Sequence, residues 1–157
     1  MFRKSQTSQL DLFESPSNLM GKRASKKYDD PKSWHNQFFK LVTSQVNEDN
    51  FAPLFKDSLR GAPTASIRIL ASMSILKEGF GCSDEQLFEK CEYDLLVRKA
   101  LGLANLSDKT PSLDTYYCFR RRLVEYEDSK GVNLMDTCFK DITAEQIKMF
   151  DIAGKSV

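Results

Sequence analysis

The stretch that decides the fold runs from Pro63 to Tyr126. It opens with TASIRILASMSILKEGF at residues 64–80, which is almost wholly apolar and ends in a short break around residues 79–81. There follow SDEQLFEKCEYDLLVRKALGL at 83–103, the polar turn NLSDKTPS at 105–112, and LDTYYCFRRRLVEYE at 113–127. The pattern predicts three helices joined by turns, an arrangement typical of a helix-turn-helix-like module.

The first segment predicts the central helix of the domain. With about 100° of turn per residue, its apolar side chains fill one broad face, and Ile67 and Ile75 fall elsewhere on the wheel. A helix that is apolar most of the way round packs against neighbours on several sides. The broad face consists of Ala65, Ile69, Leu70, Met73, Leu76 and Phe80.

The second segment begins with a capping box, in which Ser83 is the N-cap residue and Gln86 stands three positions later. Arg98 falls on the apolar face of this helix. An i,i+4 pair with Asp94, together with packing of the aliphatic stem, explains a charge there. Gly102 stands just after the expected end of the helix, where glycine is favoured.

The third segment predicts a helix that starts near Pro111, with Thr110 or Ser112 as its cap. Aromatic and aliphatic residues recur along it at helical spacing and predict a stripe that faces the core. The stripe consists of Tyr116, Phe119, Leu123 and Tyr126.

Three consecutive arginines, Arg120–Arg122, follow the start of that stripe. Successive residues of a helix fan out by about 100°, so the three side chains cannot all face one partner. Arg121 points most directly away from the core, with Tyr117 beside it. Asp114 and Glu125 share this outward face and reduce its positive charge.

From about Arg60 to Tyr126, nearly half of the chain, the sequence resembles the N-terminal helical domain of bacterial insertion-sequence transposases of the InsH-like, DDE type. The matching features include the apolar helix before the break at residues 79–81 and the SDEQLFEKCEYD helix. LLVRKALGL resembles the family's arginine shortly before Leu-Gly-Leu. LDTYYCFRRRL resembles its helix of a small polar residue, aromatics and Phe-Arg-x-x-Leu.

This resemblance implies a DNA-binding module that recognises the terminal inverted repeats of a mobile element. A helix in the major groove reads bases with outward residues near its N-terminal end, here Tyr117 and Arg121, while basic neighbours contact phosphates. The expected phosphate contacts are Arg98, Lys99, Arg120 and Arg122, so DNA contact is the alternative role for Arg98. Double-stranded DNA is the expected partner, a homodimer is compatible with it, and the expected location is cytoplasmic and nucleoid-associated.

The composition is that of an ordinary globular protein and indicates one domain. Of 157 residues, 41% are hydrophobic and 29% are charged, and the formal net charge is +1. Because this balance excludes binding through overall charge, a nucleic-acid surface must be a local patch. The near-neutral charge favours the alternative function, a helical oligomerisation or protein-interaction module without specific DNA binding.

The chemistry-bearing residues point away from catalysis in this chain. Four cysteines at positions 82, 91, 118 and 138 lack C-x-x-C spacing, and one histidine accompanies them, which argues against zinc and for a reduced cytosolic protein. No signal peptide or membrane span is recognisable. Metal-dependent strand transfer needs carboxylates that converge on two divalent ions. We therefore expect no catalytic residue and no cofactor here, with divalent metal confined to a catalytic domain absent from this chain.

Residues 1–30 are polar and predict a disordered tail. Within it, QLDLF at Gln9-Leu10-Asp11-Leu12-Phe13 resembles the motif by which bacterial proteins dock on the replication sliding clamp. Its apolar residues have no core to join, as expected of a docking peptide, although the segment could instead fold back on its own domain or match by chance. Residues 21–27, GKRASKK, could contact phosphates, but a solvated linker is the simpler interpretation.

The remaining segments complete a compact all-α domain over residues 31–150. We expect a helix from about Lys32 to Val46, with Pro31 suited to its first turn and Asp30 as the cap. His35 is expected on the surface because it lies off the apolar stripe. A short helix follows at Phe51–Leu59. The last helix spans Leu134–Met149, or is two pieces broken near Asp141, and residues 151–157 are a linker towards the absent catalytic domain.

Overall fold

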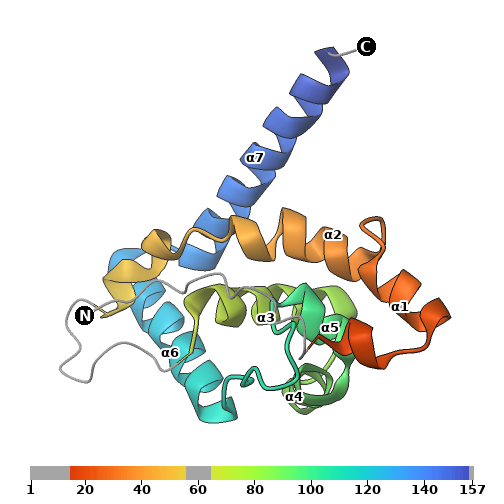
Figure 1. Ribbon diagram of the computed structural model, residues 1–157. Coiled ribbons are helices and arrows are strands. Elements are labelled where there is room, and N and C mark those ends of the chain that lie inside the picture. The colour runs from red at the N-terminus through yellow and green to blue at the C-terminus, as the bar shows by residue number, and fades with distance from the viewer. Residues whose placement is uncertain (1–14, 56–64, 156–157) are drawn as a thin grey trace.

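The computed structural model describes residues 15–55 and 65–155, and every regular element in those ranges is helical (Figure 1). The fold class predicted from the sequence, an all-α domain, is therefore confirmed. The elements are the 3₁₀ turns η1 (Pro16–Leu19), η2 (Thr43–Gln45) and η3 (Glu48–Phe55) and the helices α1 (Lys22–Asp29), α2 (Trp34–Leu41), α3 (Ile67–Phe80), α4 (Asp84–Tyr93), α5 (Leu95–Ala100), α6 (Leu113–Lys130) and α7 (Leu134–Lys155).

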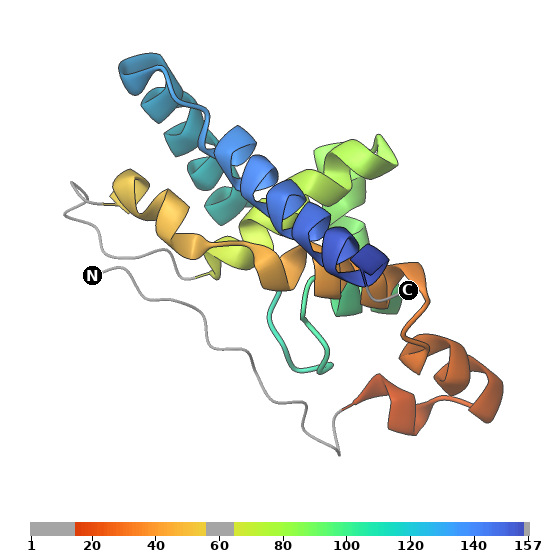
Figure 2. The ribbon, with the colours of Figure 1, turned by 90° about the horizontal axis from the view of Figure 1, so that it is seen from above.

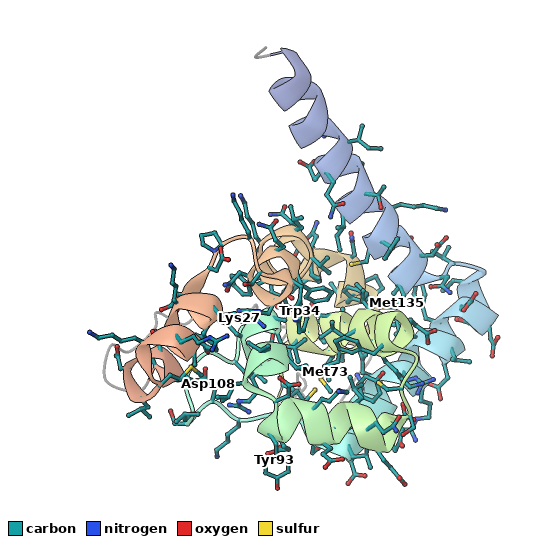
Figure 3. All side chains as sticks on the ribbon, turned by 90° about the vertical axis from the view of Figure 1, so that its right-hand side faces the viewer. Lys27, Trp34, Met73, Tyr93, Asp108 and Met135 are labelled. Carbon is teal, nitrogen blue, oxygen red and sulfur yellow. The ribbon has the colours of Figure 1, made fainter. Side chains whose placement is uncertain are left out.

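Helix α3 lies at the centre of the body between α2 and α4, and α5 packs against both α2 and α4 (Figures 1 and 2). Leu70, Ala71 and Met73 have no exposed surface, which confirms that the central helix is packed on several sides. Figure 3 shows Met73 inside the body, whereas Tyr93 extends outward from the end of α4. The helix ends at Gly81, whose φ of 61° is a left-handed conformation that glycine adopts readily.

The capping box predicted at Ser83 and Gln86 is present, but the helix that follows is two helices, α4 and α5. Asp94 causes the break, because its carboxylate accepts hydrogen bonds from the backbone N–H groups of Leu96 (3.0 Å) and Val97 (3.2 Å) and so caps α5. Gly102 has a φ of 84° just after α5, in agreement with the prediction for the helix end.

The N-terminal part of the chain corrects several expectations. α1 and η1 lie within residues 1–30, which the sequence predicted to be a disordered tail. These two elements are ordered because Tyr28, which is 3% exposed, and Pro16 are buried against the rest of the protein. Residues 9–13, which carry the clamp-like motif, lie outside the described residues. α2 is shorter than predicted and starts after Ser33, because Asp30 instead forms a turn with the Lys32 N–H at 3.0 Å.

His35 is the clearest departure on α2, because it is completely buried where the sequence placed it on the surface. Its Nε2 lies 2.8 Å from the Tyr28 carbonyl oxygen, so this nitrogen carries the proton and donates it. The burial follows from α1, whose Tyr28 ring lies against the imidazole with 5.9 Å between the centroids.

Helix α7 is one continuous helix through Lys155, so of the two predicted alternatives the one with a break near Asp141 is wrong. The helix also extends past Met149 into residues that were predicted to belong to a linker. The Asp141 carboxylate accepts from Asn50 Nδ2 at 2.8 Å and ties the helix to η3. Cys138 and Ile142 are buried in the core, and beyond them α7 projects from the body (Figure 1). Within the described ranges no helix has the length and apolar character needed to cross a membrane.

Candidate nucleic-acid interface

Helix α6 separates a buried face from an exposed one, as its sequence predicted. The Ser112 side chain caps the helix by accepting from the Thr115 N–H at 3.2 Å. Tyr116 and Phe119 are 1% and 2% exposed, and their rings pack against aromatic rings of α4 and η3. This packing fixes the rotation of α6 and therefore decides which residues face outward.

Tyr117 and Arg121 occupy the exposed face. Tyr117 is 42% exposed, and the Arg121 side chain is 70% exposed. The nearest carboxylate to Arg121 is that of Glu125, with 4.0 Å between the charged atoms, so the guanidinium is only loosely paired. Local desolvation, the charge of the Asp84 carboxylate and a hydrogen bond with that carboxylate raise the pKa of the Tyr117 hydroxyl above its usual value.

Arg120 and Arg122 flank this face, but their guanidinium groups already have partners. Arg120 pairs with Asp84 at 3.3 Å and remains 46% exposed. Arg122 is half-buried: it donates to the Leu54 carbonyl oxygen at 3.3 Å, and its guanidinium lies 4.9 Å from the Phe55 ring centroid. Arg120 is thus available to a ligand at the cost of one surface ion pair, whereas Arg122 mainly holds η3 against α6.

Arg98 is buried and does not lie on the exposed surface of the domain. It is 5% exposed and donates to the Cys91 carbonyl oxygen at 3.1 Å and to three groups of the α5–α6 loop. It does not form the predicted pair with Asp94, because that carboxylate caps α5. The loop acceptors are Asn105 O at 3.1 Å, Asp108 O at 2.8 Å and Thr110 Oγ1 at 3.1 Å.

Lys99 is likewise committed inside the protein. Its ammonium group donates to the Tyr28 carbonyl oxygen at 2.8 Å, pairs with Asp29 at 3.2 Å and lies 3.9 Å from the centroid of the Tyr28 ring. The side chain is 15% exposed. The structure therefore places Tyr117, Arg120 and Arg121 on one accessible face and removes Arg98 and Lys99 from it.

The helix-turn-helix expectation fits one connection and not another. Residues 81–83 join α3 to α4, close to the three to four residues usual for such a turn. The loop from α5 to α6 spans residues 101–112 and is held open by Arg98 rather than tightly turned. Among the described residues, no group of three His, Cys, Asp or Glu side chains could hold a metal ion.

The helical core, the buried arginine before Leu101-Gly102-Leu103 and the outward arginine face of α6 define a small helical domain with the motifs of a transposase N-terminal region. A family model described as Transposase domain (DUF772) matches residues 26–122. The chain therefore belongs to the DUF772 transposase-domain family. Comparison with curated proteins gave no match. Comparison with solved structures gave none either.

Proposed function

We propose that this chain is the DNA-recognition module of an insertion-sequence transposase of the InsH-like, DDE type, and that α6 contacts the terminal inverted repeats of its element. The observation that supports this most is the fixed outward face of α6, where Tyr117 and Arg121 are exposed on a helix whose opposite face is buried. The family membership supports the connection with transposition.

The chemistry of this face suits a DNA groove. The Arg121 guanidinium can donate two hydrogen bonds to the O6 and N7 atoms of a guanine, the commonest specific contact of arginine in the major groove. Arg120 can exchange its surface pair with Asp84 for a phosphate oxygen, and such contacts set the register without reading sequence. The exposed Tyr117 side chain adds an aromatic surface beside them, and its hydroxyl can exchange the contact with Asp84 for an acceptor on DNA.

The test compares the affinity of the unmodified chain and of Arg121→Ala for duplex DNA that carries the terminal repeat. Lys130→Ala is the matched control, because Lys130 is an exposed cation at the end of the same helix. Loss of a guanine contact should weaken binding to the terminal repeat by about 1–3 kcal/mol, or about 5- to 150-fold. The control should bind like the unmodified chain. Equal affinities of all three proteins at low and moderate salt would reject the placement of α6.

A helical oligomerisation or protein-interaction module is the second candidate function, and α7 favours it. This helix projects from the body (Figure 1) and exposes 54% of Phe139 and 57% of Ile147. Such side chains on a projecting helix suit a protein partner. Sedimentation equilibrium would show a concentration-dependent dimer for the chain and a monomer for Ile147→Glu, whereas a monomer at all concentrations would rule out self-association.

Gln9–Phe13 remains a proposed docking peptide for the sliding clamp of DNA replication, and it rests on the sequence alone. A peptide of residues 5–17 should bind purified clamp in the micromolar range expected of a short segment that orders on binding. Replacement of Leu12 and Phe13 by alanine should abolish this binding. Absence of binding by the intact chain at high clamp concentration would discard the proposal.

A further inference from the structure

Helix α1 displays four exposed cations within six residues, Lys22, Arg23, Lys26 and Lys27. At 3.6 residues per turn they fall within an arc of about 140°, and Tyr28 lies on the opposite side of the helix. Within the described part of the chain, no carboxylate forms an ion pair with any of the four. These four side chains therefore form an exposed, positively charged surface, which we call the α1 basic face.

Among the described residues, no contact offsets the repulsion between these four cations. Lys22 and Lys26, and likewise Arg23 and Lys27, stand four residues apart, where like charges on a helix repel. Lys22 and Arg23 also occupy the first turn, where the positive end of the helix dipole disfavours cations, and no acidic residue balances them there. An anionic ligand removes both penalties, because it supplies the missing negative charge.

The opposite side of α1 is anchored firmly to the body. Tyr28 is 3% exposed, and its carbonyl oxygen accepts from His35 Nε2 at 2.8 Å, Asn36 Nδ2 at 2.9 Å and Lys99 Nζ at 2.8 Å. Three donors on one carbonyl join α1 to both α2 and α5. The helix is thus a fixed platform, and a preorganised surface loses less entropy on binding than a flexible tail.

The contacts that hold α1 to the body also engage the carboxylate of Asp29, the last residue of this helix. Asp29 accepts a hydrogen bond from the Ser17 hydroxyl and pairs with Lys99 at 3.2 Å. The Ser17 hydrogen bond and then Lys99 lower the pKa of this carboxyl, which keeps it charged and engaged. The Asp29 carboxylate therefore pairs inward. The exposed Asp30 carboxylate at the C-cap accepts from the Lys32 N–H at 3.0 Å, and within the described residues it forms no ion pair with the α1 basic face.

We propose that the α1 basic face is a second nucleic-acid contact, which binds the phosphate backbone of duplex DNA without reading its sequence. A lipid surface fits it less well, because an interfacial helix needs a free apolar face and the Tyr28 side of α1 is covered by the protein. Figures 1 and 2 agree that α1 and α6 lie at opposite ends of the body, and in Figure 3 α1 forms its outer edge near Lys27.

This inference takes only the choice of DNA as the polyanion from the proposed function, and it assigns to Lys99 a role in positioning α1 rather than in contacting phosphate. Binding of the α1 basic face should be sequence-independent and salt-dependent, since neutralised phosphates release counterions. Recognition by α6 should appear instead as a preference for terminal-repeat sequence. The two contacts are therefore separable by experiment.

The test measures affinity for a duplex of arbitrary sequence by fluorescence anisotropy across a salt series. Lys22, Lys26 and Lys27 are replaced by glutamine in one variant, and the exposed Lys130, Lys140 and Lys148 in a control with the same net charge. Each phosphate contact contributes about 0.9 to the slope of log affinity against log salt, so the first variant should lose about 2 to 3 units of slope. The control should retain the slope of the unmodified chain.

Equal slopes for the unmodified chain and the α1 variant would overturn the inference, as would an equal loss in the control. Replacement of the same three lysines by arginine should keep the slope, which excludes a loss caused by misfolding. Salt-dependent binding to phosphatidylserine vesicles that matches or exceeds binding to DNA would assign the face to a membrane and also overturn the inference. If Arg121→Ala leaves binding unchanged while the α1 variant loses slope, only the proposed role of α6 fails.

Discussion

Replacement of Arg98 by methionine should destabilise the fold strongly, because the side chain satisfies four acceptors from inside the protein. Two of these, the carbonyl oxygens of Cys91 and Asn105, form buried hydrogen bonds, and methionine offers them no donor. Each of these oxygens keeps one further donor, the Thr110 hydroxyl at 3.2 Å on Cys91 and the Asp108 N–H at 3.1 Å on Asn105. The loss is therefore that of two buried hydrogen bonds to a charged group, which contribute about 1.5–3 kcal/mol each and about 3–6 kcal/mol together. The part-buried bonds to Asp108 and Thr110 can be replaced by water and add less.

Urea unfolding followed by circular dichroism measures this free energy of unfolding directly. The matched control is Arg121→Met, which makes the same chemical change on a helix at a side chain that is 70% exposed. It should alter the stability by less than about 0.5 kcal/mol. If Arg98→Met lost less than 1 kcal/mol, or no more than the control, the structural role assigned to Arg98 would be refuted and its predicted role in DNA binding would regain support.

Two further predictions concern glycines and thiols. Gly102→Ala should destabilise the chain by about 1–3 kcal/mol in the same unfolding assay, because its φ is 84° and a new Cβ would lie 3.1 Å from an aromatic ring of α2. Gly79→Ala, a helical site with nothing within 4 Å, should instead be neutral or stabilising. Burial raises the pKa of Cys91 to about 12 and that of Cys138 to about 11, so a thiol reagent at pH 8 should label them only after unfolding. Above pH 9 the unfolded state ionises these thiols first and binds fewer protons, so stability should fall as pH rises, and equal stability at pH 8 and 10.5 would contradict this.

The parts of the fold that sequence predicts are those decided by local chemistry. The capping box at Ser83 depends on residues three positions apart, and the core stripe through Tyr116 depends on helical spacing, so both were visible in the sequence. Arg98 was placed only in part, because three of its four acceptors are backbone carbonyls seven to ten residues away, and no residue pattern reveals a carbonyl.

The N-terminal region was mispredicted for a related reason. A polar composition is typical of a disordered tail, but a single buried aromatic, Tyr28, with three donors on its carbonyl is enough to fix α1. His35 then becomes buried because α1 covers it, and Lys99 turns inward to meet the same carbonyl. Each of these outcomes depends on the long-range contact between α1 and the body rather than on the neighbouring sequence.

The central claim, that the chain recognises the ends of its element, is tested most directly by comparing two duplexes. One carries the terminal inverted repeat, and the other carries the same bases in scrambled order. The account predicts tighter binding to the repeat, with a ratio of at least about 10³ at moderate salt, and a log-linear fall in affinity for both duplexes as salt rises. Equal affinity for the two duplexes, or binding that does not change with salt, would contradict it.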